Sequence, residues 1–156
     1  MNGIHDRSNA VVRPPLALAL AVLGGLVAER LIPLPFLPES VPRIWAGSAV
    51  LVLGLALGAW AIATLRQAGT RVETSKPTTA IVSRGPYRVT RNPIYLGMLA
   101  ILIGLAIALN TAWLLVALVP FYLIIRFGVI AREEAYLERK FGDTYLSYKS
   151  RVRRWI

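Results

Sequence analysis

The sequence contains no cysteine and a single histidine, His5, among its 156 residues. The missing cysteine excludes disulfides, thiolate nucleophiles and cysteine-based metal sites, although it leaves the redox compartment open. His5 lies in a polar N-terminal tail, so we also expect neither histidine-based catalysis nor a bound metal ion.

Acidic residues are also scarce, because eight Asp and Glu stand against eighteen Lys and Arg, giving a formal net charge of +10. In a soluble protein this excess would point first to nucleic acid. However, 56% of the residues are hydrophobic and the mean hydropathy is +0.57. A single small domain cannot bury that much apolar surface in its own interior. We therefore expect a lipid bilayer as partner and no nucleic acid.

Apolar segments predict a single all-α membrane domain with about four transmembrane helices. Their expected ranges are 14–34, 44–65, 93–109 and 112–130, with a loop at 66–92 and a C-terminal segment, expected to be helical, at 131–156. The first segment resembles a signal peptide, but no convincing cleavage site ends it, so we interpret it as an uncleaved anchor. In the second, Gly54 and Gly58 favour close packing against another helix.

The last two segments form one long apolar run that is interrupted only at Asn110 and Thr111. Such a run is too long for one ordinary span, so we expect a helical hairpin that turns at Asn110. Tyr95 and Arg126 lie almost equally far along the chain from that turn, and they should return to the same depth. Glu133 and Glu134 then follow about one turn further out, so polar groups converge at one membrane face.

Four spans place both termini and the 66–92 loop on one side of the membrane, and nearly all basic residues lie there. They are Arg7, Arg13, Arg66, Arg71, Lys76, Arg84, Arg88, Arg91 and the basic residues from 132 to 154, against Arg30 and Arg43 on the other side. The positive-inside rule makes this side cytoplasmic.

Each polar residue near the converging ends also has a purely structural interpretation. Arg126 is costly at membrane depth unless it is paired, which makes it a functional candidate, but its guanidinium can also reach lipid phosphate. Glu133 and Glu134 can form a solvated helix face. Asn92 can cap the helix that follows it, and Tyr87 and Tyr95 are typical interfacial aromatics.

Three pieces of sequence together resemble the isoprenylcysteine carboxyl methyltransferase family. They are GPYRVTRNPIY at residues 85–95, the pair Glu133–Glu134, and FGDTYLSYKSRV at residues 141–152. The resemblance covers roughly residues 66–153 and extends more loosely to the phospholipid methyltransferases. It implies an integral membrane enzyme, and with the small size of the chain it leads us to expect a bacterial plasma membrane.

In that family the cytoplasmic ends of the last two membrane helices, the preceding loop and the C-terminal segment enclose S-adenosyl-L-methionine. Carried over by position, the resemblance implies a set of cofactor-binding residues in this chain. These residues are Thr79, Ala80, Ile81, Val82, Tyr87, Asn92, Pro93, Ile94, Tyr95 and Glu133. Aromatic faces and carboxylates suit the sulfonium and ammonium of the cofactor.

Two positions depart from the family pattern. Asn92 stands where the family usually has histidine, and it cannot carry a proton charge. An arginine that the family assigns to the substrate carboxylate falls on Val129, which puts the prenylcysteine substrate in doubt. We assign catalytic roles to Arg126, as a replacement one turn earlier, and to Glu134. An amine acceptor must lose a proton, and Glu133 or Glu134 is the nearest candidate base.

The resemblance thus predicts in-line transfer of a methyl group to a lipid-like or other membrane-partitioned acceptor, a carboxylate, amine or thiol. Membrane sterol reductases resemble the same architecture, so an NADPH-dependent reductase is the alternative enzyme. A small transporter or structural membrane subunit is the non-enzymatic alternative. The sequence leaves the acceptor and the oligomeric state open.

Overall fold

The computed structural model describes residues 10–70 and 77–156, and His5, Arg7, Arg71 and Lys76 lie outside the described residues. Within those ranges the secondary structure is helical, apart from one parallel bridge between Thr90 and Arg153. The helices are α1 (Pro14–Leu31), α2 (Arg43–Gln67), the 3-10 helix η1 (Gly85–Arg88), α3 (Pro93–Leu109), α4 (Ala112–Leu123), the π-helix η2 (Ile124–Ile130), α5 (Ala131–Phe141) and α6 (Asp143–Arg151).

Three of the described helical stretches are long and apolar enough to cross a membrane. They are Pro14–Leu31, Arg43–Gln67 and the continuous stretch Ala112–Phe141. The third continues beyond the expected range of 112–130, but its last part, α5, is polar and amphipathic. Helix α3 is strongly apolar and has 17 residues, so it is shorter than the other three.

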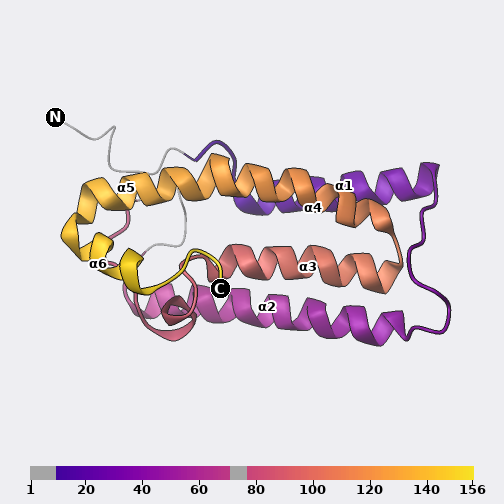
Figure 1. Ribbon diagram of the computed structural model, residues 1–156, viewed down its shortest axis with the longest axis horizontal. Coiled ribbons are helices and arrows are strands. Elements are labelled where there is room, and N and C mark those ends of the chain that lie inside the picture. The colour runs from indigo at the N-terminus through magenta and orange to yellow at the C-terminus, as the bar shows by residue number, and fades with distance from the viewer. Residues whose placement is uncertain (1–9, 71–76) are drawn as a thin grey trace.

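Helices α2 and α3 lie side by side along their lengths, while α1 and α4 form a second pair in the bundle (Figure 1). Glycines allow the close approach of α2 and α3. A Cβ atom built on Gly97 would lie 2.6 Å from the carbonyl oxygen of Gly54, and one on Gly104 would lie 2.6 Å from the amide nitrogen of Leu51. Only residues without a side chain fit at this distance, because backbone meets backbone.

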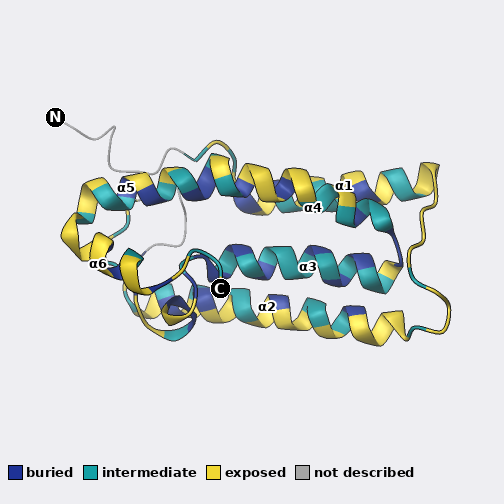
Figure 2. Ribbon diagram, in the orientation of Figure 1, coloured by how far each residue is buried: buried dark blue, intermediate teal, exposed yellow. Residues whose placement is uncertain are grey.

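Much of the outer surface of the bundle is apolar, as the exposed faces of α1, α2 and α4 show (Figure 2). Trp45 on α2 is 80% exposed, and Leu23 on α1 and Val119 on α4 are each 59% exposed. An exposed apolar surface of this extent is typical of a protein whose solvent is lipid.

The chain reverses between α3 and α4 at Asn110, which adopts a left-handed conformation with a φ of 51°. Its side-chain oxygen accepts hydrogen bonds from the backbone N–H groups of Phe36 (3.1 Å) and Leu37 (2.8 Å). The hydroxyl of Thr111 donates to Glu29 Oε2 at 2.7 Å. The loop after α1 is therefore fixed to the hairpin turn, at the end of the bundle opposite α5 and α6 (Figure 1).

Candidate functional site

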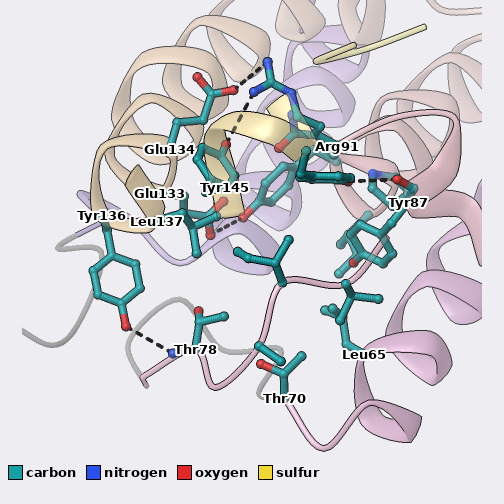
Figure 3. A pocket seen from close by; sticks show the side chains of 18 residues that line it. Leu65, Thr70, Thr78, Tyr87, Arg91, Glu133, Glu134, Tyr136, Leu137 and Tyr145 are labelled. Atoms are coloured by element: carbon teal, nitrogen blue, oxygen red, sulfur yellow. Dashed lines mark hydrogen bonds and ion pairs between the residues drawn. The ribbon is translucent and has the colours of Figure 1, made fainter. Parts of the chain in front are cut away.

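A cavity lies at the other end of the bundle, where the loop before α3 meets α5 and α6 (Figure 3). Its lining combines aromatic, apolar, polar and charged side chains from α2 and the turn after it, the 77–92 loop, α3, α5 and α6. The lining residues are Leu65, Thr70, Thr78, Ala80, Ile81, Val82, Tyr87, Arg91, Asn92, Pro93, Ile94, Tyr95, Glu133, Glu134, Tyr136, Leu137, Tyr145 and Tyr148.

The hairpin brings Tyr95, near the start of α3, against Glu133, near the start of α5. The Tyr95 hydroxyl donates a hydrogen bond of 2.9 Å to Glu133 Oε1, across 38 residues of sequence. Pro93 is the first residue of α3, where its missing N–H costs nothing and its fixed φ suits the start of the helix that carries Tyr95. The convergence expected from counting residues on either side of Asn110 is therefore present.

Glu133 lies just beyond the apolar part of its helix and faces the cavity. Burial raises the pKa of Glu133 to about 7, the hydrogen bond from Tyr95 opposes this rise, and the charge of Glu134 adds to it. A carboxyl group with a pKa near neutrality can both accept and release a proton at physiological pH.

Glu134, the next residue, is bound by two arginines. Arg154 donates to its two oxygens from Nε at 2.9 Å and from Nη2 at 2.6 Å, and Arg91 Nη2 lies 3.3 Å from Oε1. Burial alone would raise the pKa of Glu134, but the hydrogen bonds from Arg154 and the charge of Arg91 hold it below its ordinary value. Glu134 is therefore ionised and already satisfied, which makes it a poor proton acceptor.

The C-terminal tail is hydrogen bonded to the segment before α3. Arg91 N–H donates to the carbonyl oxygen of Arg153 at 3.0 Å. The Thr90 hydroxyl and the Asn92 side-chain amide both donate to the carbonyl oxygen of Arg154, at 3.1 Å and 2.9 Å. The sequence suggested that the side chain of Asn92 caps α3. It does not, because its amide is hydrogen bonded to the tail instead.

Five of the six tyrosines line the cavity, namely Tyr87, Tyr95, Tyr136, Tyr145 and Tyr148. The Tyr148 hydroxyl donates to the carbonyl oxygen of Tyr87 at 2.8 Å, which joins α6 to η1. Burial raises the pKa of Tyr145 to about 12 and also raises the pKa of Tyr87 and of Tyr148. These phenols are therefore neutral, and their rings suit a cationic ligand.

Most of the residues that the resemblance implied lie together at this cavity. Those that line it are Ala80, Ile81, Val82, Tyr87, Asn92, Pro93, Ile94, Tyr95, Glu133 and Glu134. Thr79 does not line it, because its N–H donates to Thr70 Oγ1 and its hydroxyl to the carbonyl oxygen of Gly69, each at 3.1 Å.

Arg126 also lies outside the lining of the cavity. It is in the π-helix η2, and its guanidinium carbon lies 5.1 Å from the centre of the Phe127 ring. Val129, the position of the family arginine, is fully buried in the helical core. Neither position places a cation at the cavity, and among the described residues the arginine that lines it is Arg91.

The structure adds lining residues that we did not select from the sequence, above all Arg91, Tyr136, Tyr145 and Tyr148. Some signals for them were available. Tyr145 and Tyr148 lie within the quoted string at residues 141–152, and a spacing of three puts both on one face of a helix. Tyr136 follows Glu133 at the same spacing.

Comparisons with known proteins agree with this geometry. A family model described as phospholipid methyltransferase matches residues 42–144, which run from the start of α2 into α6. An uncharacterized protein of Haemophilus influenzae is 44% identical over 63 residues, which are 40% of this chain and 100% of that relative. No solved structure matches the chain. The family match covers most of the chain and agrees with the resemblance found at residues 66–153, so the chain belongs to the phospholipid methyltransferase family.

Proposed function

We propose that this protein is an integral membrane methyltransferase that uses S-adenosyl-L-methionine and methylates a lipid-like or other membrane-partitioned acceptor. Membership of the family implies methyltransferase activity in general. The observation that carries the rest of the proposal is the Tyr95–Glu133 pair, which lies in a tyrosine-lined cavity at the end of apolar helices.

The side chains at the cavity suit each part of the proposed cofactor. Tyrosine faces and the Glu133 carboxylate favour the sulfonium and the ammonium. Apolar side chains such as Leu65, Val82 and Leu137 provide a surface for the adenine ring. When it is bound, the cofactor supplies an electrophilic methyl group on its sulfonium.

The residues of the chain act by alignment, by exclusion of water and by proton transfer. The buried wall of the cavity lowers the local dielectric and orders the reactants. Glu133 is the group placed to accept the proton that an amine or thiol acceptor must lose, whereas a carboxylate acceptor requires no base. Of the two candidate bases we therefore favour Glu133 over Glu134.

Two apolar grooves on the outside of the bundle support a membrane-partitioned acceptor. One apolar groove between α1 and α3 is lined by residues that include Leu18, Val22 and Met98. A second groove, between α3 and α4, includes Leu99 and Tyr122. Grooves with almost no polar surface suit hydrocarbon and exclude a free polar metabolite.

We also propose four spans in a bacterial plasma membrane, with the cavity and both termini on the cytoplasmic side. In this arrangement α3 is the fourth span, and a helix of 17 residues reaches about 25 Å, which a thinner or locally adapted bilayer accommodates. The basic residues around the cavity end, against few at the opposite end, support this orientation.

A reductase that uses NADPH would need cations at the cavity for several phosphates. Arg84 and Arg88 are exposed, and neither lines the cavity. Only Arg91 among the arginines does so within the part of the chain that the structure describes. No specific observation favours a reductase, a transporter or a structural subunit, so we propose the methyltransferase alone.

The test is to add radiolabelled S-adenosylmethionine to membranes with and without the protein and to identify the labelled product. We expect Glu133→Gln and Tyr95→Phe to lower the transfer rate about 10- to 100-fold, because a buried polar partner is lost. Glu39→Gln is the control outside the cavity and should keep the wild-type rate. Wild-type protein that neither binds the cofactor nor labels any membrane component would refute the proposal.

A further inference from the structure

Arg91 is a buried cation whose donors are only partly used. Its side chain is 9% exposed, and the residue lines the cavity. Nη2 lies 3.3 Å from Glu134, and Nη1 donates to the Tyr145 hydroxyl at 3.4 Å, which is a long hydrogen bond. The Nε atom is buried and has no hydrogen-bond partner.

Glu134, the ion-pair partner of Arg91, is shared with another cation. Glu134 is held more closely by Arg154, at 2.6 Å and 2.9 Å, than by Arg91. Two arginines and one glutamate leave a net charge of +1 at this wall of the cavity. The salt bridges of these arginines are with Glu134, whereas Glu133 is hydrogen bonded to Tyr95.

A buried guanidinium with five N–H donors and few acceptors is costly unless a ligand supplies the missing acceptor. The geometry that a guanidinium recognises best is that of a carboxylate or phosphate, which can accept two parallel hydrogen bonds. The cavity therefore has a cationic wall at Arg91 and an acidic group at Glu133 (Figure 3). A ligand that fits both must itself carry an anion and a cation.

We propose that Arg91 binds the carboxylate of the methionyl part of S-adenosylmethionine and thereby sets the orientation of the cofactor in the cavity. This inference rests on the proposed function. With the carboxylate at Arg91, the sulfonium is free to lie near the rings of Tyr95 and Tyr87 and near Glu133. Glu134 acts as a positioning residue, because it holds Arg91 without contacting the ligand.

The test compares two ligands that differ only in this group, S-adenosylmethionine and decarboxylated S-adenosylmethionine. Their dissociation constants are measured by calorimetry on the detergent-purified full-length protein. We expect the wild-type protein to bind the decarboxylated ligand about 10- to 100-fold more weakly, as for a lost charge-assisted hydrogen bond. In Arg91→Gln this ratio should fall to about one, because affinity is lost for the carboxylate-bearing ligand alone.

Arg154→Gln is the matched control, because it breaks the same ion cluster at Glu134 and removes an arginine that does not line the cavity. It should keep most of the wild-type ratio. If Arg91→Gln does not fold, Arg91→Lys decides instead, and we expect it to lower the ratio several-fold because an ammonium cannot form the paired contact.

The possible failures are distinct. Wild-type protein that binds neither ligand overturns the proposed function, and the inference with it. Wild-type protein that binds both ligands equally, or an Arg91 variant that weakens both by the same factor, overturns the role of Arg91 and leaves the proposed function standing. A ratio that collapses equally in Arg154→Gln would also overturn it.

Discussion

Glu133 and Glu134 are adjacent in sequence, yet their surroundings give them opposite protonation behaviour. Glu133 meets a neutral phenol at Tyr95, whereas Glu134 meets the guanidinium groups of Arg91 and Arg154. Sequence reasoning identified the pair as functional and named either member as a candidate base, and the proposed function now favours Glu133. The distinction depends on which partners the fold delivers, and Arg154 comes from a tail 20 residues away.

The raised pKa of Glu133 makes stability depend on pH. The folded protein keeps a proton up to about pH 7 that the unfolded chain has already released near 4.5. The free energy of unfolding from this group should therefore be greatest below about pH 4.5 and should fall as the pH rises to about 7. We expect Glu133→Gln to flatten this decline in melting temperature, measured in detergent across that range.

The exposed variant Glu39→Gln should leave the pH profile of the wild-type protein unchanged, since Glu39 lies at the far end of the bundle. A decline that persists in Glu133→Gln would show that another group titrates in this window.

Glu134→Gln should instead destabilise the protein by roughly 3 kcal/mol, because it leaves Arg91 and Arg154 close together without their shared anion. Raising the salt concentration should recover part of the loss by screening the two cations. The measurement is thermal unfolding in detergent at two ionic strengths. Unchanged stability together with lost methyl transfer would restore the catalytic role that the sequence suggested for Glu134.

At the scale of the elements, the contact between α2 and α3 depends on backbone meeting backbone. A Cβ atom on Gly54 would lie 2.8 Å from the carbonyl oxygen of Gly97, whereas one on Gly58 meets nothing within 4 Å. We expect Gly54→Ala to cost about 1–3 kcal/mol by forcing the helices apart. Gly58→Ala, on the same helix, should be neutral or slightly stabilising because alanine favours helix. Melting temperatures of the two variants in detergent give the comparison.

A Gly54→Ala variant as stable as Gly58→Ala would mean that α2 and α3 are not held at this distance. The sequence predicted a packing role for both glycines from their spacing alone. It could not say which of them has a neighbour opposite its side chain, because the partner helix and its rotation are tertiary properties.

The segment between α4 and α5 shows another limit of sequence reasoning. The position of the hairpin turn could be predicted, since Asn110 and Thr111 are the only polar residues in a long apolar run. The π-helix η2 could not be predicted, although Pro120 shortly before it removes a backbone donor from the helix. Its wider turns shift the angular position of every later residue, so the face that carries Glu133 cannot be derived from a period of 3.6.

At the scale of the whole molecule, the four-span arrangement makes a prediction about sidedness. The chain lacks cysteine, so a single cysteine introduced at an exposed serine is the only thiol of the protein that a maleimide can label. We expect Ser83→Cys and Ser147→Cys to react with an impermeant maleimide only from the cytoplasmic side. Ser40→Cys, in the loop after α1, should react only from the other side. Labelling of intact cells and of inverted vesicles measures this, and equal sidedness of Ser40 and Ser147 would exclude four spans.

The overall architecture was predictable because hydropathy and the single interruption at Asn110 determine which segments are helices. The candidate cavity was predictable only in part. The meeting of its residues on α3 and α5 follows from the hairpin. The position of the C-terminal tail could not be predicted, because the Asn92 amide can donate to any carbonyl that the fold brings near. Thr79 was carried over from the family resemblance as part of the stretch 79–82, but its hydroxyl donates to the carbonyl oxygen of Gly69 and it does not line the cavity.

The attachment of residues 152–155 to the start of α3 has a consequence for how the protein is made. Trp155 packs against Tyr122 with ring centres 5.6 Å apart, and the carbonyl groups of Arg153 and Arg154 bind the chain before α3. These residues leave the ribosome after all the helices have been synthesised, so the ligand cavity is assembled only after membrane insertion is well advanced. A nascent chain cannot capture a ligand early, because the cavity wall at Arg91 and Asn92 is held by residues that follow all the helices.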